Sequence, residues 1–121
     1  MSQAFLSRGY GFVRKNKTCS HCKKQKGELQ ICRNKNIDDV IPDNEKITLI
    51  KIDAEGSEYP ILRGTERIIT NFKPKLAVAI YQSVEDMLFI PKYLKQLVPE
   101  YKLHVRHYSK GTAETVLYAY I

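Results

Sequence analysis

The sequence predicts an open α/β sheet, and three observations support this fold class. Short apolar runs rich in β-branched residues alternate with segments in which apolar residues recur at helical spacing. Strands that are joined through such helices run parallel and use right-handed crossovers. The last two apolar runs, in contrast, are joined only by "SKGTA" (109–113), which is too short for a helical crossover. We therefore expect parallel strands followed by a C-terminal antiparallel hairpin.

The first unit of this pattern is a strand followed by a helix. The run "ITLIKI" (47–52) is nearly all apolar, as in a parallel strand that is covered on both faces. In the helix after it, Ser57 is placed to cap the first turn, and Pro60 falls where a missing N–H group costs nothing. Helical spacing is kept by Tyr59, Ile61, Leu62, Thr65, Ile68, Ile69 and Phe72. The segment "FKP" (72–74) ends this helix.

The second unit repeats the pattern and adds the hairpin. "KLAVAIY" (75–81) predicts a second buried strand, and "SVEDMLFIPKYLKQL" (83–97) predicts a helix. We expect Pro91 to break that helix into two pieces, because proline removes a helical hydrogen bond. The strands "YKLHVRHY" (101–108) and "ETVLYAY" (114–120) then form the hairpin.

Polar residues gather at one predicted edge of this sheet. Ligands of open α/β sheets bind outside the carboxyl ends of the strands. The residues that end the parallel strands or begin the last, antiparallel strand are Asp53, Glu55, Tyr81, Gln82, His107, Tyr108, Glu114 and Thr115. The sequence therefore predicts a binding site at this edge, with the carboxylates at the end of the first core strand.

The charge is distributed unevenly along the 121 residues, which are enough for one domain. The net charge is +7, and residues 1–36 hold nine Lys/Arg against one acid, whereas residues 37–121 hold eleven against twelve. We interpret 1–36 as a basic, irregular arm, with short strands at 10–13 and 28–32. Such an arm could contact phosphates, but no recognition-helix pattern accompanies it, so a nucleic-acid partner is disfavoured.

The composition is that of a protein in a reducing compartment. No apolar run reaches the roughly 18 residues that span a bilayer, and the start has no secretory signal. We expect a cytoplasmic location and no membrane partner. Cys19, Cys22 and Cys32 supply three of the four ligands that zinc prefers, and His21 is badly placed to be the fourth. Reduced thiols are the preferred interpretation, so no metal is predicted.

Four blocks of the chain resemble one enzyme family. They are "IDDVI", "TLIKIDAEGSEYPILRG", "KPKLAVAIYQSVEDMLFIPKYLKQLVPEYKLHVRHYS" and "ETVLYAY". In this order they resemble the C-terminal half of FkbM-type methyltransferases, over residues 37–121, about 70% of the chain. The resemblance implies a Rossmann-like methyltransferase half-sheet and S-adenosylmethionine as cofactor. It also implies methyl transfer to a hydroxyl group of a sugar or another small molecule.

The resemblance has two departures. The family usually carries His at the position of Gln82, and its cofactor-binding Gly-rich turn has no counterpart here. "RGYGF" (8–12) gives only G-x-G, without a preceding strand or a following helix. The alternative function is therefore a non-catalytic interaction module that derives from this fold and uses the basic arm.

The first group of candidate site residues follows the first core strand. Asp53 and Glu55 would favour the positive charges of the cofactor, and Asp53 is also a candidate to take the proton of the substrate hydroxyl. The alternative is that these acids interact with the dipole of the next helix. Gly56 is assigned to the same cofactor-binding turn as a backbone requirement. Glu58 lies in the first helical turn, where a dipole role and a substrate contact are equally open.

The second group lies further along the chain. His107 is the candidate general base, since imidazole titrates near neutral pH; a structural histidine on the face of Leu103 and Val105 is the alternative. The full set of predicted substrate-binding residues is Glu58, Tyr81, Gln82, Arg106, Tyr108 and Glu114.

The resemblance also implies an unpaired strand. In a complete enzyme, strand 47–52 would pair with a strand of the front half, which this sequence lacks. An open apolar edge of this kind invites pairing with another chain. We therefore expect self-association through the edge of strand 47–52.

Overall fold

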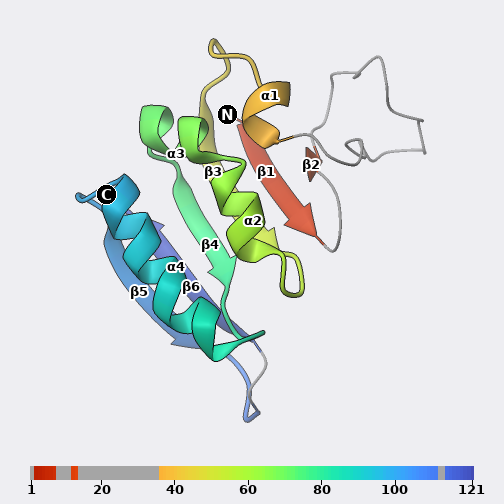
Figure 1. Cartoon of the computed structure of the whole chain (residues 1–121), viewed down its shortest axis with the longest axis vertical. Helices are drawn as coiled ribbons and strands as arrows, with labels where there is room; N and C mark the ends of the chain where they lie inside the picture. The colour runs from red at the N-terminus through yellow and green to blue at the C-terminus, as the bar shows by residue number, and fades with distance from the viewer. Residues whose placement is uncertain (1, 8–11, 14–35, 112–113) are drawn as a thin grey trace.

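The computed structural model describes residues 2–7, 12–13, 36–111 and 114–121, which form one sheet with helices packed against it (Figure 1). The sheet has six strands in the order β2-β1-β3-β4-β6-β5. In chain order the elements are β1 (Ser2–Ser7), β2 (Phe12–Val13), α1 (Ile37–Val40), β3 (Ile47–Asp53), α2 (Glu58–Arg63), α3 (Glu66–Phe72), β4 (Lys75–Ala79), α4 (Val84–Leu97), β5 (Lys102–His107) and β6 (Thr115–Tyr120).

The strand directions confirm the predicted fold class. β1, β3 and β4 pair in parallel, and β6 runs antiparallel to both of its neighbours, β4 and β5. The C-terminal hairpin is therefore present as predicted. Its second strand, β6, lies between β4 and β5, so that the carboxyl ends of β3, β4 and β5 all point to the same edge.

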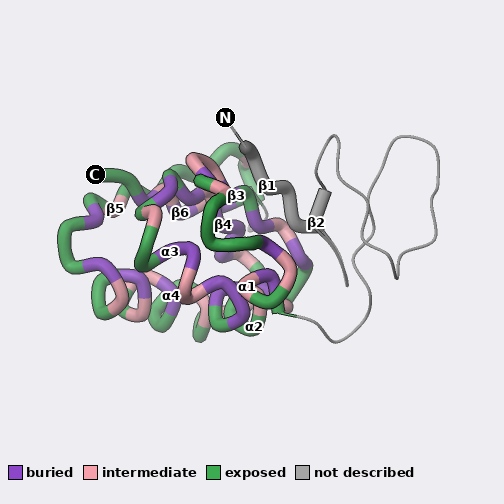
Figure 2. Tube along the Cα trace, turned by 90° about the horizontal axis from the view of Figure 1, so that it is seen from above, coloured by how far each residue is buried: buried purple, intermediate pink, exposed green. Residues whose placement is uncertain are grey.

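In the described part of the chain, helices α1 to α4 lie on one side of the sheet, as the view along the strands in Figure 2 shows. The expectation that strand 47–52 is covered on both faces was wrong for the part of the chain that the structure describes. On its other face Lys51 is exposed and Leu49 is only half-buried. The reason is topological. The connections from β3 to β4 and from β4 to β5 step in the same direction across the sheet, and right-handed crossovers that step the same way place their helices on the same face.

The core lies between the sheet and this helical layer. Alternate residues of the central strands point into it and are fully buried, and α3 and α4 contribute apolar side chains from the other side. The main contributors are Ile50, Ile52, Leu76, Val78, Leu117, Ile68, Leu94 and Tyr101. Burial of each such aliphatic side chain contributes about 1.5–3 kcal/mol, so this layer holds the strands in place.

Tyr101 makes the stability of this core sensitive to alkaline pH. Its ring is fully buried, its hydroxyl donates a 2.6 Å hydrogen bond to the carbonyl of Pro74, and burial raises its pKa above the ordinary value of 10.0. Ionisation is thus easier in the unfolded chain, and the free energy of unfolding should fall as the pH rises above about 10, by up to about 1.4 kcal/mol per pH unit for this group. Urea unfolding at pH 8–11 tests this. Tyr101→Phe should show a shallower decline, and an unchanged slope would contradict this role of Tyr101.

The helix predicted over residues 57–72 is two helices, α2 and α3, with a break at Gly64. The break accommodates the start of α1: the Asp38 backbone N–H donates to the Gly64 carbonyl at 2.9 Å. A Cβ at Gly64 would meet Oδ1 of Asn36 at 3.1 Å, so a larger residue would crowd that segment. The Asp38 carboxylate accepts hydrogen bonds from the backbone N–H groups of Arg67 (2.7 Å) and Ile68 (3.1 Å). A side chain distant in sequence therefore caps α3, while Ser57 and the adjacent α2 show no side-chain cap.

Removal of this cap should destabilise the fold. We expect Asp38→Ala to lower the free energy of unfolding by about 1.5 kcal/mol, because two backbone N–H groups at the start of α3 lose their acceptor. Chemical unfolding followed by circular dichroism measures the loss. Asp39→Ala is the matched control, since Asp39 is exposed on the same helix. Equal stability losses in the two variants would contradict the capping role.

Pro91 does not divide α4, so that prediction was wrong. The helix runs unbroken over 14 residues with Pro91 inside it. Buried Ile90 and Leu94 anchor the helix to the core just before and three residues after the proline. Tertiary packing on both sides therefore outweighs the missing hydrogen bond. The helix begins at a true cap, where Ser83 Oγ accepts from the Asp86 N–H at 3.0 Å.

The edge of strand 47–52 is not open. β1 pairs with β3 in parallel over residues 2–7, so the expected open edge is corrected, and residues 2–7 form a strand that the interpretation of 1–36 did not include. β2 coincides with part of the strand expected at 10–13. The strand expected at 28–32, the cysteines and Gly9 and Gly11 lie outside the described residues.

Candidate functional site

The predicted edge is real: the ends of β3, β4 and β5 and the start of β6 lie along it (Figure 1). Asp53 is the last residue of β3, and Tyr81 and Gln82 follow β4 by two and three residues. His107 ends β5, directly opposite Thr115 at the start of β6. The sequence pattern thus predicted correctly which strand ends share this edge.

The turn from β3 into α2 is held by Glu58. One oxygen of its carboxylate accepts the Ala54 N–H at 2.9 Å, and the other accepts the Gly56 N–H at 2.8 Å. The side chain is 0% exposed. A carboxylate that is fully buried and hydrogen-bonded to its own turn is a structural group. The prediction that Glu58 contacts substrate is therefore corrected.

The same turn requires an unusual backbone at two positions. Gly56 has φ +103°, and the preceding Glu55 has φ +48°. A Cβ at Gly56 would meet nothing within 4 Å, so steric crowding is not the reason for glycine. The reason is the positive φ itself, which side chains rarely adopt. The turn projects Glu55 outward, where it is exposed at the edge of the sheet.

Asp53 and Tyr81 come together from neighbouring strands. The Tyr81 hydroxyl lies 3.4 Å from Oδ1 of Asp53, a long hydrogen bond with the tyrosine as donor. Burial, and then the negative charge of Asp53, raise the pKa of Tyr81 above its ordinary value. The tyrosine therefore remains a neutral donor beside an acceptor carboxylate. This pair is the centre of the candidate site, and strand order predicted its proximity.

A second polar group lies on the β5–β6 hairpin. His107 Nδ1 and Thr115 Oγ1 are 2.8 Å apart, which orients the imidazole ring. The hydroxyls of Tyr108 and Tyr118 are 2.6 Å apart, and the Arg106 guanidinium lies over the Tyr108 ring at 5.2 Å from its centroid. Tyr118 was not among the predicted site residues. The signal was available, since strand pairing places residues of β6 beside those of β5.

The two groups are separated. β4 and β6 lie between β3 and β5, so three strand spacings of about 4.8 Å put Asp53 and His107 roughly 14 Å apart. Alternation also assigns them to opposite faces: Ile52 and Val105 point to the helical layer, as His107 does, and Asp53 points away from it. The two predicted catalytic residues therefore do not act on one proton together in this arrangement.

The remaining predicted residues lie at the periphery of the edge. Gln82 and Glu114 are exposed, and Glu114 closes the hairpin through its carbonyl, which accepts the Tyr108 N–H at 3.1 Å. Within the described ranges, no group of three or more His, Cys, Asp or Glu side chains could hold a metal ion. In those same ranges no helix combines the length and apolar character needed to cross a membrane.

Comparison with known proteins identifies the family. The model of the methyltransferase FkbM domain matches residues 8–102, which is most of the chain. The chain belongs to the FkbM methyltransferase family. The FkbM methyltransferase from Methylobacillus flagellatus has a solved structure that is similar to this chain, with 40% sequence identity and a TM-score of 0.64. None of the curated proteins that were compared matches the sequence.

The match covers most of this chain but only a small part of the FkbM methyltransferase from Methylobacillus flagellatus. It covers 70% of this chain but 22% of the other, so the chain spans about a fifth of the length of that enzyme. The predicted family and α/β methyltransferase fold are thereby confirmed. The FkbM family is a family of methyltransferases.

Proposed function

We propose that the chain takes part in S-adenosylmethionine-dependent methyl transfer to an oxygen atom of a small-molecule hydroxyl, sugars included. The observation that carries the proposal is the Asp53–Tyr81 pair at the carboxyl ends of β3 and β4, in a chain of the FkbM methyltransferase family. When bound, the cofactor supplies an electrophilic methyl group on a positively charged sulfur. The residues of this chain would bind the cofactor and orient the hydroxyl substrate toward its methyl group.

The donor set fits such a ligand. S-adenosylmethionine carries positive charges on its ammonium and sulfonium groups, and the edge offers the half-buried carboxylate of Asp53 and the exposed Glu55. Carboxylates near such charges favour binding, the more so where water is partly excluded. Tyr81, as a neutral donor, would hold the Asp53 carboxylate in position.

The hydroxyl substrate would lie toward the hairpin. Arg106, Tyr108, Gln82 and Glu114 are exposed there and offer both donors and acceptors. His107, oriented by Thr115, would contact the substrate on its own side of the edge and would not act at a methyl group held near Asp53. We do not assign Glu58 to either ligand, because its carboxylate already holds the turn.

Gly9 and Gly11 come directly after β1, which corrects the expectation that no strand precedes "RGYGF", but the next described element is the strand β2 and not a helix. On this proposal the chain supplies the methionine end of the cofactor site and the substrate edge. A non-catalytic module derived from the same fold is the competing function.

Transfer of a tritiated methyl group tests the proposal. The purified chain is incubated with labelled S-adenosylmethionine and a panel of sugars and polyols, and the products are treated with alkali. We expect alkali-stable label, as in a methyl ether, on at least one acceptor. Alkali-labile label would indicate a carboxylate acceptor instead. Absence of transfer by the folded chain, with every acceptor, would favour the non-catalytic module.

A further inference from the structure

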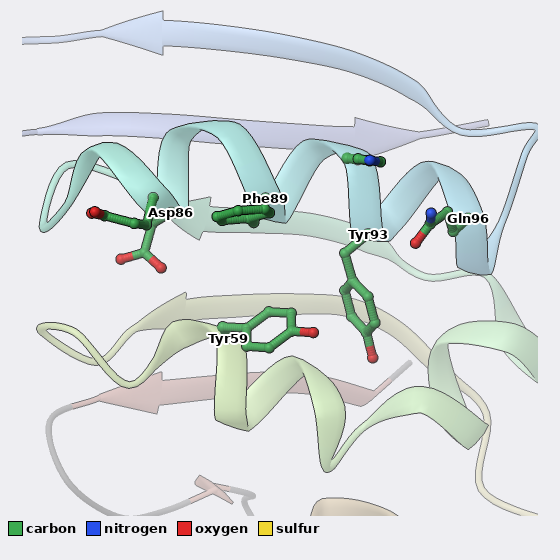
Figure 3. Close-up of a pocket in the computed structure, with 7 residues that line it drawn as sticks. Tyr59, Asp86, Phe89, Tyr93 and Gln96 are labelled. Atoms are coloured by element: carbon green, nitrogen blue, oxygen red, sulfur yellow. The ribbon is translucent and has the colours of Figure 1, made fainter.

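A cavity of about 440 Å³ lies between α2 and α4, on the helical side of the molecule (Figure 3). This volume is in the range of small-ligand sites. Its lining residues are Tyr59, Glu85, Asp86, Phe89, Lys92, Tyr93 and Gln96. None of the residues assigned to the edge of the sheet is among them.

Three aromatic rings form the walls of this cavity. The rings of Tyr59 and Tyr93 lie 5.1 Å apart at an angle of 71°, and Figure 3 shows both in the space between the two helices. The hydroxyl of Tyr93 donates to Glu66, which leaves the ring of Tyr93 to line the cavity. Phe89 supplies the third ring and is 59% exposed. The three rings together give the cavity an aromatic lining.

The charge of the side chains that line the cavity changes from negative to positive along α4. Glu85 and Asp86 lie in the first turn, and Lys92 and Gln96 lie two to three turns further on. The dipole of α4 explains acids in its first turn. It does not explain why two rings of α4 and one of α2 line a cavity beside them. Aromatic faces together with carboxylates are the chemistry that recognises organic cations.

We propose that this cavity binds a quaternary ammonium group. The ring faces of Tyr59, Phe89 and Tyr93 would contact the methyl groups, and Asp86 and Glu85 would supply the opposite charge. A quaternary group is favoured over a primary one because it is weakly hydrated and needs no hydrogen-bond acceptors, whereas a lysine ammonium is strongly hydrated. The proposal is independent of the proposed methyl transfer, since the two sets of residues do not overlap.

Choline and its uncharged isostere, 3,3-dimethylbutan-1-ol, give the sharpest test. Ring signals of Tyr59, Phe89 and Tyr93 are followed by NMR as each compound is added to the full chain. We expect saturable shifts with choline and none with the isostere. Phe89→Ala and Asp86→Asn should each weaken choline binding about tenfold. Leu88→Ala, equally exposed on α4 but outside the lining, should leave it unchanged.

Four results would overturn the proposal. Equal shifts with the isostere would mean that the cavity is only apolar, and no saturable shift with choline would mean that it is no cation site. Acetyl-lysine methylamide that binds as tightly as choline would exclude a preference for the quaternary group. Saturating S-adenosylmethionine should leave the choline shifts unchanged, and displacement of choline would refute a site separate from the edge of the sheet.

Discussion

Replacement of Glu58 by alanine is expected to lower the free energy of unfolding by about 3 kcal/mol. The substitution removes both acceptors of the turn between β3 and α2 and leaves the N–H groups of Ala54 and Gly56 without their partner. The Ala54 N–H lies beside a buried side chain, where an unsatisfied donor costs more than the hydrogen bond itself contributes. Urea unfolding followed by circular dichroism measures the change.

Two further variants make this expectation specific. Glu58→Gln keeps one oxygen but places an amide NH₂ against a backbone donor, so we expect an intermediate loss of stability. Glu85→Ala removes an exposed acid in the first turn of another helix and should change the stability by less than about 0.5 kcal/mol. A loss for Glu58→Ala no larger than that of Glu85→Ala would contradict the role of Glu58 in the turn.

Asp53→Asn is expected to weaken the binding of S-adenosylmethionine about tenfold or more, because the substitution removes the negative charge and little else. Asparagine is nearly isosteric and can still accept the hydrogen bond from Tyr81. Calorimetric titration gives the two dissociation constants. Asp39→Asn makes the same change in net charge on an exposed helix and should bind as the parent does. Equal weakening of binding in both variants would mean that only the net charge of the chain matters, and it would contradict a direct role of Asp53.

The strands and the site edge could be predicted because their signals are local. A run such as "ITLIKI" (47–52) carries the strand pattern in its own residues. The topological rule for open α/β sheets then predicts that a site lies at the carboxyl ends of such strands. Asp53 and Tyr81 follow from that rule alone. The five-residue link 109–113 fixed the hairpin in the same way, since its length excluded a crossover.

The features that were missed depend on contacts between distant residues. Asp38 caps a helix whose first residues lie almost thirty positions further along the chain. No local pattern in "IDDVI" predicts this contact. The break at Gly64 follows from the same contact. Pro91 shows the reverse case, in which packing of Ile90 and Leu94 overrides a strong local signal. The pairing of β1 with β3 is likewise non-local.

For Glu58 the sequence could not separate two roles. An acid in a first helical turn is compatible with a dipole interaction, a ligand contact or a hydrogen bond to the preceding turn. Only the backbone path, with positive φ at Glu55 and Gly56, brings the N–H groups of the turn onto its carboxylate. The distance between Asp53 and His107 could not be predicted either. It depends on the position of β6 between β4 and β5, which no local sequence pattern indicates.

The most direct test of a cofactor site at this edge is a titration of the ¹⁵N-labelled chain with S-adenosylmethionine, followed by amide NMR. We predict saturable shifts for residues 53–56 and 81–82, and little change in α3. A folded chain whose edge amides do not move at millimolar cofactor, or in which the shifts are confined to the cavity between α2 and α4, would contradict the assignment.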